Sequence, residues 1–201
     1  MKVIALKPNP NLYTCKSYLL LGDWNTLSDV NTLIDPGTDA YVLNEIENTH
    51  TGVGKKQIDA IVLTHNHFDH IGGTAPIKDK FNATVYANIK TNSLVDKILK
   101  DEDIIRMADC DFRVIHTPGH STDSISLYCE KSQALFSGDT TLFIRDTNSS
   151  YTQDYFETIK KLSKLKIKAI YPGHGDPITE DPEGIIKYTL KNLRSCKIIS
   201  N

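Results

Sequence analysis

Five predicted strands of this 201-residue chain run directly into short polar loops. The carboxyl ends of neighbouring strands meet at one edge of layered α/β sheets, so these loops are expected to converge on one site. The length suits a single domain spanning residues 1–201. The strands and the loops that follow them are Thr32–Ile34 before Asp35, Ala60–Leu63 before THNHFDH, Phe112–Ile115 before HTPGH, Ala134–Phe136 before SGD, and Ala169–Tyr171 before PGHG.

Helical patterns alternate with these and other strands. Four more β-rich runs cover Lys2–Leu6, Ser17–Leu21, Ala83–Tyr86 and Ser124–Tyr128. Strands that alternate with helices predict an α/β domain of layered sheets and helices. The predicted helices are one after Thr38 as N-cap, with Leu43 and Ile46 on one face, one between Thr152 and Leu165, and one with Asp181 as N-cap and Pro182 at its first position.

The composition is that of an ordinary globular protein, with 39% hydrophobic and 24% charged residues. A net charge of -2 does not favour binding to nucleic acid. No apolar run approaches the roughly 20 residues of a membrane-spanning helix. The apolar run in MKVIALKPNP is too short for a signal peptide, so a cytoplasmic location is expected. The widely spaced Cys15, Cys110, Cys129 and Cys196 are expected to be reduced thiols.

The segment THNHFDH concentrates His65, His67, Asp69 and His70 within six residues. A single histidine in a loop is usually a surface or core residue, but crowding three histidines and an aspartate has no structural purpose without a cation. Imidazole and carboxylate are ligands that zinc favours, with iron and manganese as further options. His120, Asp139 and His174 complete a set of seven, which exceeds one tetrahedral zinc and suits two metals sharing a carboxylate. His50 and His116 are expected to be bystanders.

The motifs THNHFDHIGG, TPGHS, SGDT and YPGHG together resemble the successive motifs of the metallo-β-lactamase superfamily. Their details are similar to its glyoxalase II-like branch. The resemblance implies an αββα four-layer sandwich with the site at one edge of its two sheets. It also implies that His65, His67 and His120 hold one zinc ion, that Asp69, His70 and His174 hold a second, and that Asp139 bridges them.

The resemblance therefore implies a metal-dependent hydrolase acting on a small ester, thioester or lactone-like molecule. Two metals would supply hydroxide at neutral pH, with Asp69 and Asp139 as the catalytic carboxylates. Asp35 is expected to accept an N–H from a ligand imidazole, or else to form only an Asp-Pro-Gly turn. Glycines beside the motifs are expected to permit tight turns, namely Gly72, Gly73, Gly119, Gly138, Gly173 and Gly175.

Three other functions stay open. A mononuclear iron persulfide dioxygenase of the same branch would use His65, His120 and Asp139. The negative net charge argues against a phosphodiesterase or nuclease. The complete ligand set argues against a module that binds metal but catalyses no reaction. Only about one helix follows PGHG, so glutathione recognition is not expected.

The expected partner is a small-molecule substrate, and self-association into a homo-oligomer is left open. The segment from Phe143 to Tyr151 is a candidate pocket rim, with Arg145 placed to hold an anionic substrate and an ordinary surface loop as the alternative. Residues 9–14 form a second candidate rim.

Overall fold

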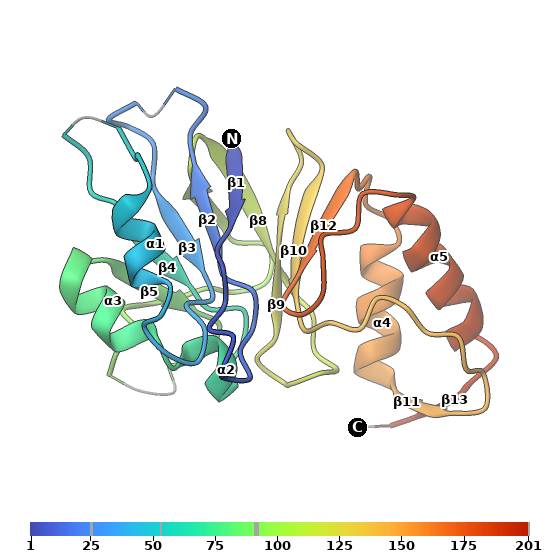
Figure 1. Cartoon of the computed structure of the whole chain (residues 1–201). Helices are drawn as coiled ribbons and strands as arrows, with labels where there is room; N and C mark the ends of the chain where they lie inside the picture. The colour runs from blue at the N-terminus through green and yellow to red at the C-terminus, as the bar shows by residue number, and fades with distance from the viewer. Residues whose placement is uncertain (25, 53, 91–92, 201) are drawn as a thin grey trace.

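Two β-sheets pack face to face in this computed structural model, which describes residues 1–24, 26–52, 54–90 and 93–200 (Figure 1). The first sheet has the order β1-β2-β3-β4-β5-β6. Strands β1 to β3 run antiparallel, whereas β3 to β6 run parallel. The strands are β1 (Lys2–Ala5), β2 (Tyr18–Leu21), β3 (Thr32–Ile34), β4 (Ala60–Val62), β5 (Thr84–Ala87) and β6 (Lys97–Ile98).

The second sheet has the order β12-β10-β9-β8-β7. Its strands are antiparallel except for the parallel pair of β10 and β12. These strands are β7 (Ile104–Met107), β8 (Cys110–His116), β9 (Ile125–Cys129), β10 (Ala134–Gly138) and β12 (Ala169–Pro172). A separate parallel pair joins β11 (Ser150–Thr152) to β13 (Lys197–Ile199).

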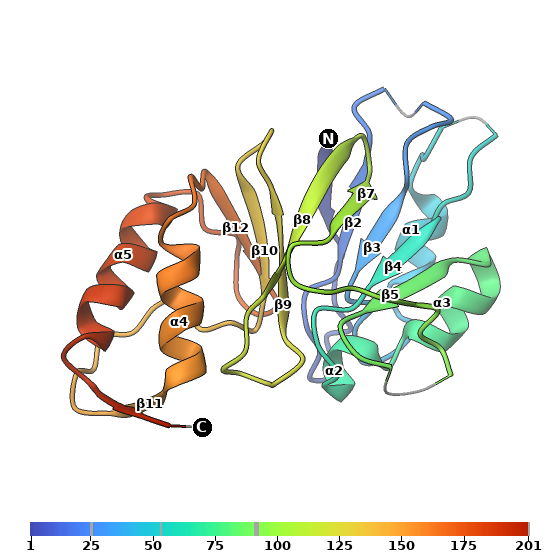
Figure 2. The same cartoon turned by 180° about the vertical axis from the view of Figure 1, so that it is seen from behind.

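Helices cover the outer face of each sheet, which completes the predicted αββα sandwich (Figures 1 and 2). Helices α1 (Leu43–Asn48) and α3 (Thr74–Phe81) lie on the first sheet, and α4 (Gln153–Leu162) and α5 (Pro182–Leu193) lie on the second. The short α2 (Phe68–Ile71) lies at one edge of the sandwich. No helix among the described ranges has the length and apolarity to cross a membrane.

The buried strands explain the layers, because successive side chains point to opposite faces of a sheet. In β2, Tyr18 and Leu20 join the core between the sheets, whereas Leu19 and Leu21 pack toward α1 and α3. The second sheet divides in the same way: Phe136 of β10 faces the core between the sheets and its neighbour Leu135 faces α4 and α5.

Two helix starts are confirmed and one is wrong. The Thr152 side chain accepts a hydrogen bond from the Tyr155 N–H at the start of α4, and Asp181 caps α5 in the same way. The helix predicted to begin after Thr38 instead begins at Leu43. Val42, which has no capping side chain, precedes the helix, and the Thr38 hydroxyl instead donates to the Tyr13 carbonyl at 2.6 Å.

Candidate metal centre

The five polar loops meet at the edge of the sandwich where α2 lies (Figure 1). Asp35 follows β3, and His65 and His67 follow β4. His120 lies between β8 and β9, Asp139 follows β10, and His174 follows β12. Asp69 and His70 lie on α2. The loops after four of these strands, β4, β8, β10 and β12, therefore bring together all seven predicted ligands, and the loop after β3 adds Asp35.

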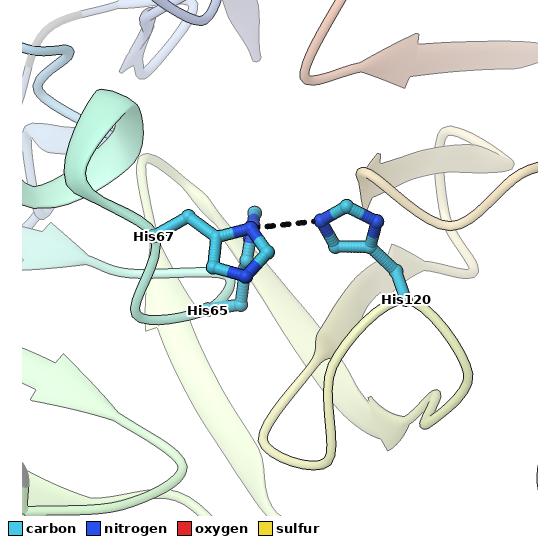
Figure 3. A group of neighbouring side chains, drawn as sticks. All are labelled: His65, His67 and His120. Atoms are coloured by element: carbon cyan, nitrogen blue, oxygen red, sulfur yellow. Dashed lines mark hydrogen bonds between the residues drawn. The ribbon is translucent and has the colours of Figure 1, made fainter.

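Three imidazoles form one group of converging nitrogens (Figure 3). Nδ1 of His67 lies 3.0 Å from Nε2 of His65 and 2.9 Å from Nε2 of His120. His65 is buried, whereas His67 and His120 are exposed. A cation at this point would be bound from the protein side and reached from the solvent side.

Asp69, His70 and His174 form a second group. Oδ2 of Asp69 lies 3.1 Å from Nε2 of His174 and 3.7 Å from Nε2 of His70. Asp69 and His70 are buried, and the His174 side chain is 34% exposed. This group also opens to solvent on one side only.

Asp139 lies between the two groups. Its Oδ2 atom is 3.5 Å from Nε2 of both His120 and His174, and 3.9 Å from Nε2 of His65. Its Oδ1 atom is 3.2 Å from Nε2 of His70. The carboxylate thus faces members of both groups, which is the arrangement expected of a shared ligand.

Asp35 and Thr64 fix the orientation of two imidazoles from behind. Oδ2 of Asp35 lies 2.8 Å from Nδ1 of His70, and the Thr64 N–H and hydroxyl donate to its two oxygens. The Thr64 hydroxyl oxygen is also 3.1 Å from Nδ1 of His65. Its hydrogen goes to Asp35, so it accepts the N–H of His65, which leaves the lone pair on Nε2. The contact predicted for Asp35 is present.

Two buried polar atoms at the centre, Nε2 of His70 and Oδ1 of Asp139, form no well-aligned hydrogen bond among the described residues, although they lie 3.2 Å from each other. Buried polar atoms without partners are costly, and an ion is one standard explanation for them. Gly173 permits the close packing here, because a Cβ atom at this position would lie 2.2 Å from Oδ1 of Asp139. The donor set, the two unpartnered atoms and their spacing all fit a divalent metal.

The electrostatics of the metal-free chain agree with this fit. Burial, reinforced by the charge of His70, lowers the pKa of His65 to about 4, so its ring is neutral at pH 7. Burial opposes charge on His70, yet the Asp35 and Asp139 carboxylates that face it raise its pKa well above the usual range. Burial likewise works against ionisation of Asp139, but the facing His70 outweighs it and holds its pKa at about 2. Two carboxylates, Asp35 and Asp139, thus face one cationic imidazole, and a metal bound at Nε2 of His70 would displace the proton from that atom.

Three further residues touch the site or its motifs. Nε2 of His116 contacts the Thr122 carbonyl at 2.8 Å, so His116 supports the loop that carries His120, in line with a structural role. Cys15 is buried with Asp35 and His70, and burial raises the pKa of its thiol to about 11. Tyr13 stacks on His174. Sequence reasoning did not place Cys15 or Thr64 here; it offered residues 9–14 as a rim without singling out Tyr13.

Two cavities flank Phe143 beside the centre. One, of about 490 Å³, reaches His120, Asp139 and His174. The other, of about 480 Å³, is lined by Arg145 and Tyr151 and shares His120, Thr141 and Phe143 with the first. The segment predicted as a pocket rim therefore does line the space beside the candidate ligands.

Comparison with known proteins agrees with this geometry. The sequence profile of the Metallo-beta-lactamase superfamily matches residues 15–174. A hydroxyacylglutathione hydrolase from Bdellovibrio bacteriovorus is 32% identical over 175 residues, which is 84% of this chain and 62% of that protein. An atrochrysone carboxyl ACP thioesterase from Aspergillus fumigatus is 25% identical over 93% of this chain and 47% of its own length. This chain thus spans about half to three fifths of these relatives.

Solved structures show the same fold. A metallo-beta-lactamase family protein from Thermus thermophilus superposes with a TM-score of 0.70 at 20% identity. The match covers 96% of this chain and 79% of that one.

Proposed function

This chain belongs to the metallo-beta-lactamase superfamily, and we propose that it is a metal-dependent hydrolase with a dinuclear zinc centre. Its substrate in this proposal is a small ester, thioester or lactone-like molecule. One observation carries the proposal: two three-residue groups of ligand atoms lie side by side, with Asp139 facing both.

His65, His67 and His120 would hold one metal, Asp69, His70 and His174 the other, and Asp139 both. When bound, two divalent metals provide hydroxide at neutral pH and offset the negative charge that develops on the reacting oxygen. Asp69 and Asp139 have carboxylate oxygens beside the open face of the centre, where they can accept hydrogen bonds from the attacking water and orient it. Asp35 and Thr64 keep the imidazoles of His70 and His65 in the required orientation.

The substrate class is supported by the relatives and by the cavities. One relative is named as a hydrolase of hydroxyacylglutathione and the other as a thioesterase, so cleavage of an acyl group is common to both names. The cavities beside the centre, of about 490 and 480 Å³, are of a size for a small molecule. Phe143, which lines both cavities, offers an apolar wall, and Arg145 offers a cation in the second cavity.

A panel of substrates with the zinc-loaded protein tests the proposal. It contains an ester, a thioester, a lactone and a phosphodiester, each assayed with the wild type and with Asp139→Ala. We expect turnover of at least one acyl substrate by the wild type and its loss in the variant. Turnover of the phosphodiester alone, or of no acyl substrate by protein with two zinc ions bound, would overturn it.

A further inference from the structure

Tyr13 brings a hydroxyl group to the open face of the centre. Its oxygen lies 3.4 Å from Nε2 of His174, the nitrogen that also faces Asp69 and Asp139. The two rings are stacked, with centroids 5.2 Å apart and planes at 20°. Tyr13 is 67% exposed, so its ring covers His174 from the solvent side.

The loop that carries Tyr13 is tied to the loops that carry the candidate ligands. The Tyr13 carbonyl accepts the Thr38 hydroxyl at 2.6 Å. The Cys15 N–H donates to the Asp69 carbonyl, and the Lys16 N–H donates to the Gly173 carbonyl next to His174. These contacts, at Tyr13 and just after it, therefore hold its backbone in place beside the centre.

The partner of this hydroxyl must change when the centre is loaded. In the metal-free chain, Nε2 of His174 can either accept from the Tyr13 O–H or donate to it, depending on the tautomer. Once Nε2 holds a metal, it carries no proton and its lone pair is used, so neither hydrogen bond remains. The O–H is then free to donate to an oxygen atom that arrives at the centre.

We propose that Tyr13 is a catalytic residue whose hydroxyl donates a hydrogen bond to the reacting carbonyl oxygen of an acyl substrate. This proposal rests on the hydrolase function proposed above and adds a donor to it. As the carbonyl is attacked, its oxygen gains negative charge, and a donor already in place stabilises that charge more than it stabilises the ground state. The role differs from simple support of the His174 ring, which the aromatic ring of Tyr13 alone would supply.

Two substitutions separate the hydroxyl from the ring. Tyr13→Phe keeps the stacking and removes the donor, whereas Tyr13→Leu removes both. The control is Tyr41→Phe, because Tyr41 is also exposed and its hydroxyl has no hydrogen-bond partner within the described ranges. With both zinc sites filled, we expect Tyr13→Phe to lower kcat about 10- to 100-fold with a smaller change in KM, and Tyr41→Phe to match the wild type.

Wild-type rates for Tyr13→Phe would overturn the proposal. If only Tyr13→Leu lost activity, the aromatic ring without its hydroxyl would be enough for catalysis. The zinc content of each variant is measured in parallel. If Tyr13→Phe loses zinc in proportion to its activity, the hydroxyl serves metal binding, which also contradicts the proposal.

A binding measurement keeps the test independent of turnover. Phenylphosphonate presents tetrahedral anionic oxygens and is not hydrolysed. We expect the zinc-loaded wild type to bind it about tenfold more tightly than Tyr13→Phe, as measured by titration calorimetry. Equal binding by the two proteins, including none by either, would contradict the role of Tyr13. A wild type that hydrolyses no acyl substrate yet shows this difference would instead refute the proposed hydrolase and leave the donor in place.

Discussion

Oδ2 of Asp35 lies 2.8 Å from Nδ1 of His70, so His70 turns its Nε2 atom toward Asp69 and Asp139. Asp35 adopts a left-handed backbone conformation, with φ of +51°, which is uncommon for a residue other than glycine. The side chain is nearly inaccessible, at 2% exposure, and accepts hydrogen bonds from both the N–H and the hydroxyl of Thr64 as well. A strained and buried carboxylate persists here because three hydrogen bonds hold it against the candidate ligands.

Replacing Asp35 by asparagine should weaken metal binding about 10- to 100-fold. Asparagine tolerates the left-handed conformation, but its single carbonyl oxygen cannot accept from both the Thr64 N–H and the His70 ring, which face different oxygens of Asp35. Chelator competition measures the affinity, and Asp111→Asn serves as the control because Asp111 is exposed on β8. Equal affinity in the wild type and Asp35→Asn would reduce Asp35 to a turn residue.

Asp139→Ala should release metal from both groups and lower kcat by more than about 100-fold. Its two oxygens face His70 on one side and His120 and His174 on the other, so its loss removes the shared negative charge between two cations. Elemental analysis and kinetics on the same preparation measure the effect. Asp79→Ala, on the exposed side of α3, is the control. A variant that keeps two metals and full activity would show that Asp139 is not the bridge.

The strands and the ligand loops could be predicted because their signals are local. All nine β-rich runs found in the sequence are strands, each with bounds within two residues of those expected. Buried strands and polar loops differ sharply in composition, and this difference can be recognised within a short stretch of sequence. The short β6, β7, β11 and β13 were not predicted. β6 and β13 span only two and three residues and are largely exposed, so they carry little hydrophobic pattern.

What the sequence could not reveal depends on contacts between distant segments. Tyr13 and His174 are 161 positions apart, and although residues 9–14 were a candidate rim, nothing in the sequence singled out Tyr13. Thr64 was passed over because a threonine before a histidine has many structural uses; only the fold shows its hydroxyl between Asp35 and His65. The error at Thr38 has the same origin, since a tertiary hydrogen bond ties its side chain to the Tyr13 loop and the helix begins only at Leu43.

Arg145→Met should raise KM for an acyl substrate that carries a carboxylate and leave KM for a neutral analogue unchanged. The guanidinium lies 4.7 Å from the Phe143 ring centre and has no ion-pair partner in the described part of the chain. A cation that is free in a cavity beside His120 is available to an anionic ligand. We expect KM for the carboxylate substrate to rise about tenfold, because the variant loses one charge-assisted hydrogen bond at a partly exposed site. Arg194→Met, at the exposed end of α5, is the control. An equal rise for both substrates would indicate a packing role.

The number of metals follows from the two ligand groups. Dialysed protein supplied with zinc should retain two ions per chain by elemental analysis. His67→Ala should remove ligation from the first group and His174→Ala from the second, because each belongs to only one of them. Retention of a single tightly bound ion by the wild type, even after supplementation, would contradict the assignment of seven ligands.

The identity of the metal decides between hydrolysis and oxygen chemistry. A single iron held by His65, His120 and Asp139 would suit a persulfide dioxygenase, and these residues do face one another, with Nε2 of both histidines within 3.9 Å of Oδ2 of Asp139. The second group argues for hydrolysis, because Asp69, His70 and His174 are equally well assembled and one iron would leave them without purpose. The protein is therefore compared after zinc loading and after anaerobic loading with ferrous iron. We expect the zinc form to hydrolyse esters or thioesters, and the iron form to consume little oxygen when given a persulfide.

Rapid oxygen uptake by a form with one iron, together with a zinc form inert toward every acyl substrate, would replace the hydrolase by the dioxygenase. Asp69→Ala provides the internal check: it should impair the hydrolase, whereas an oxygenase confined to the first group would tolerate it.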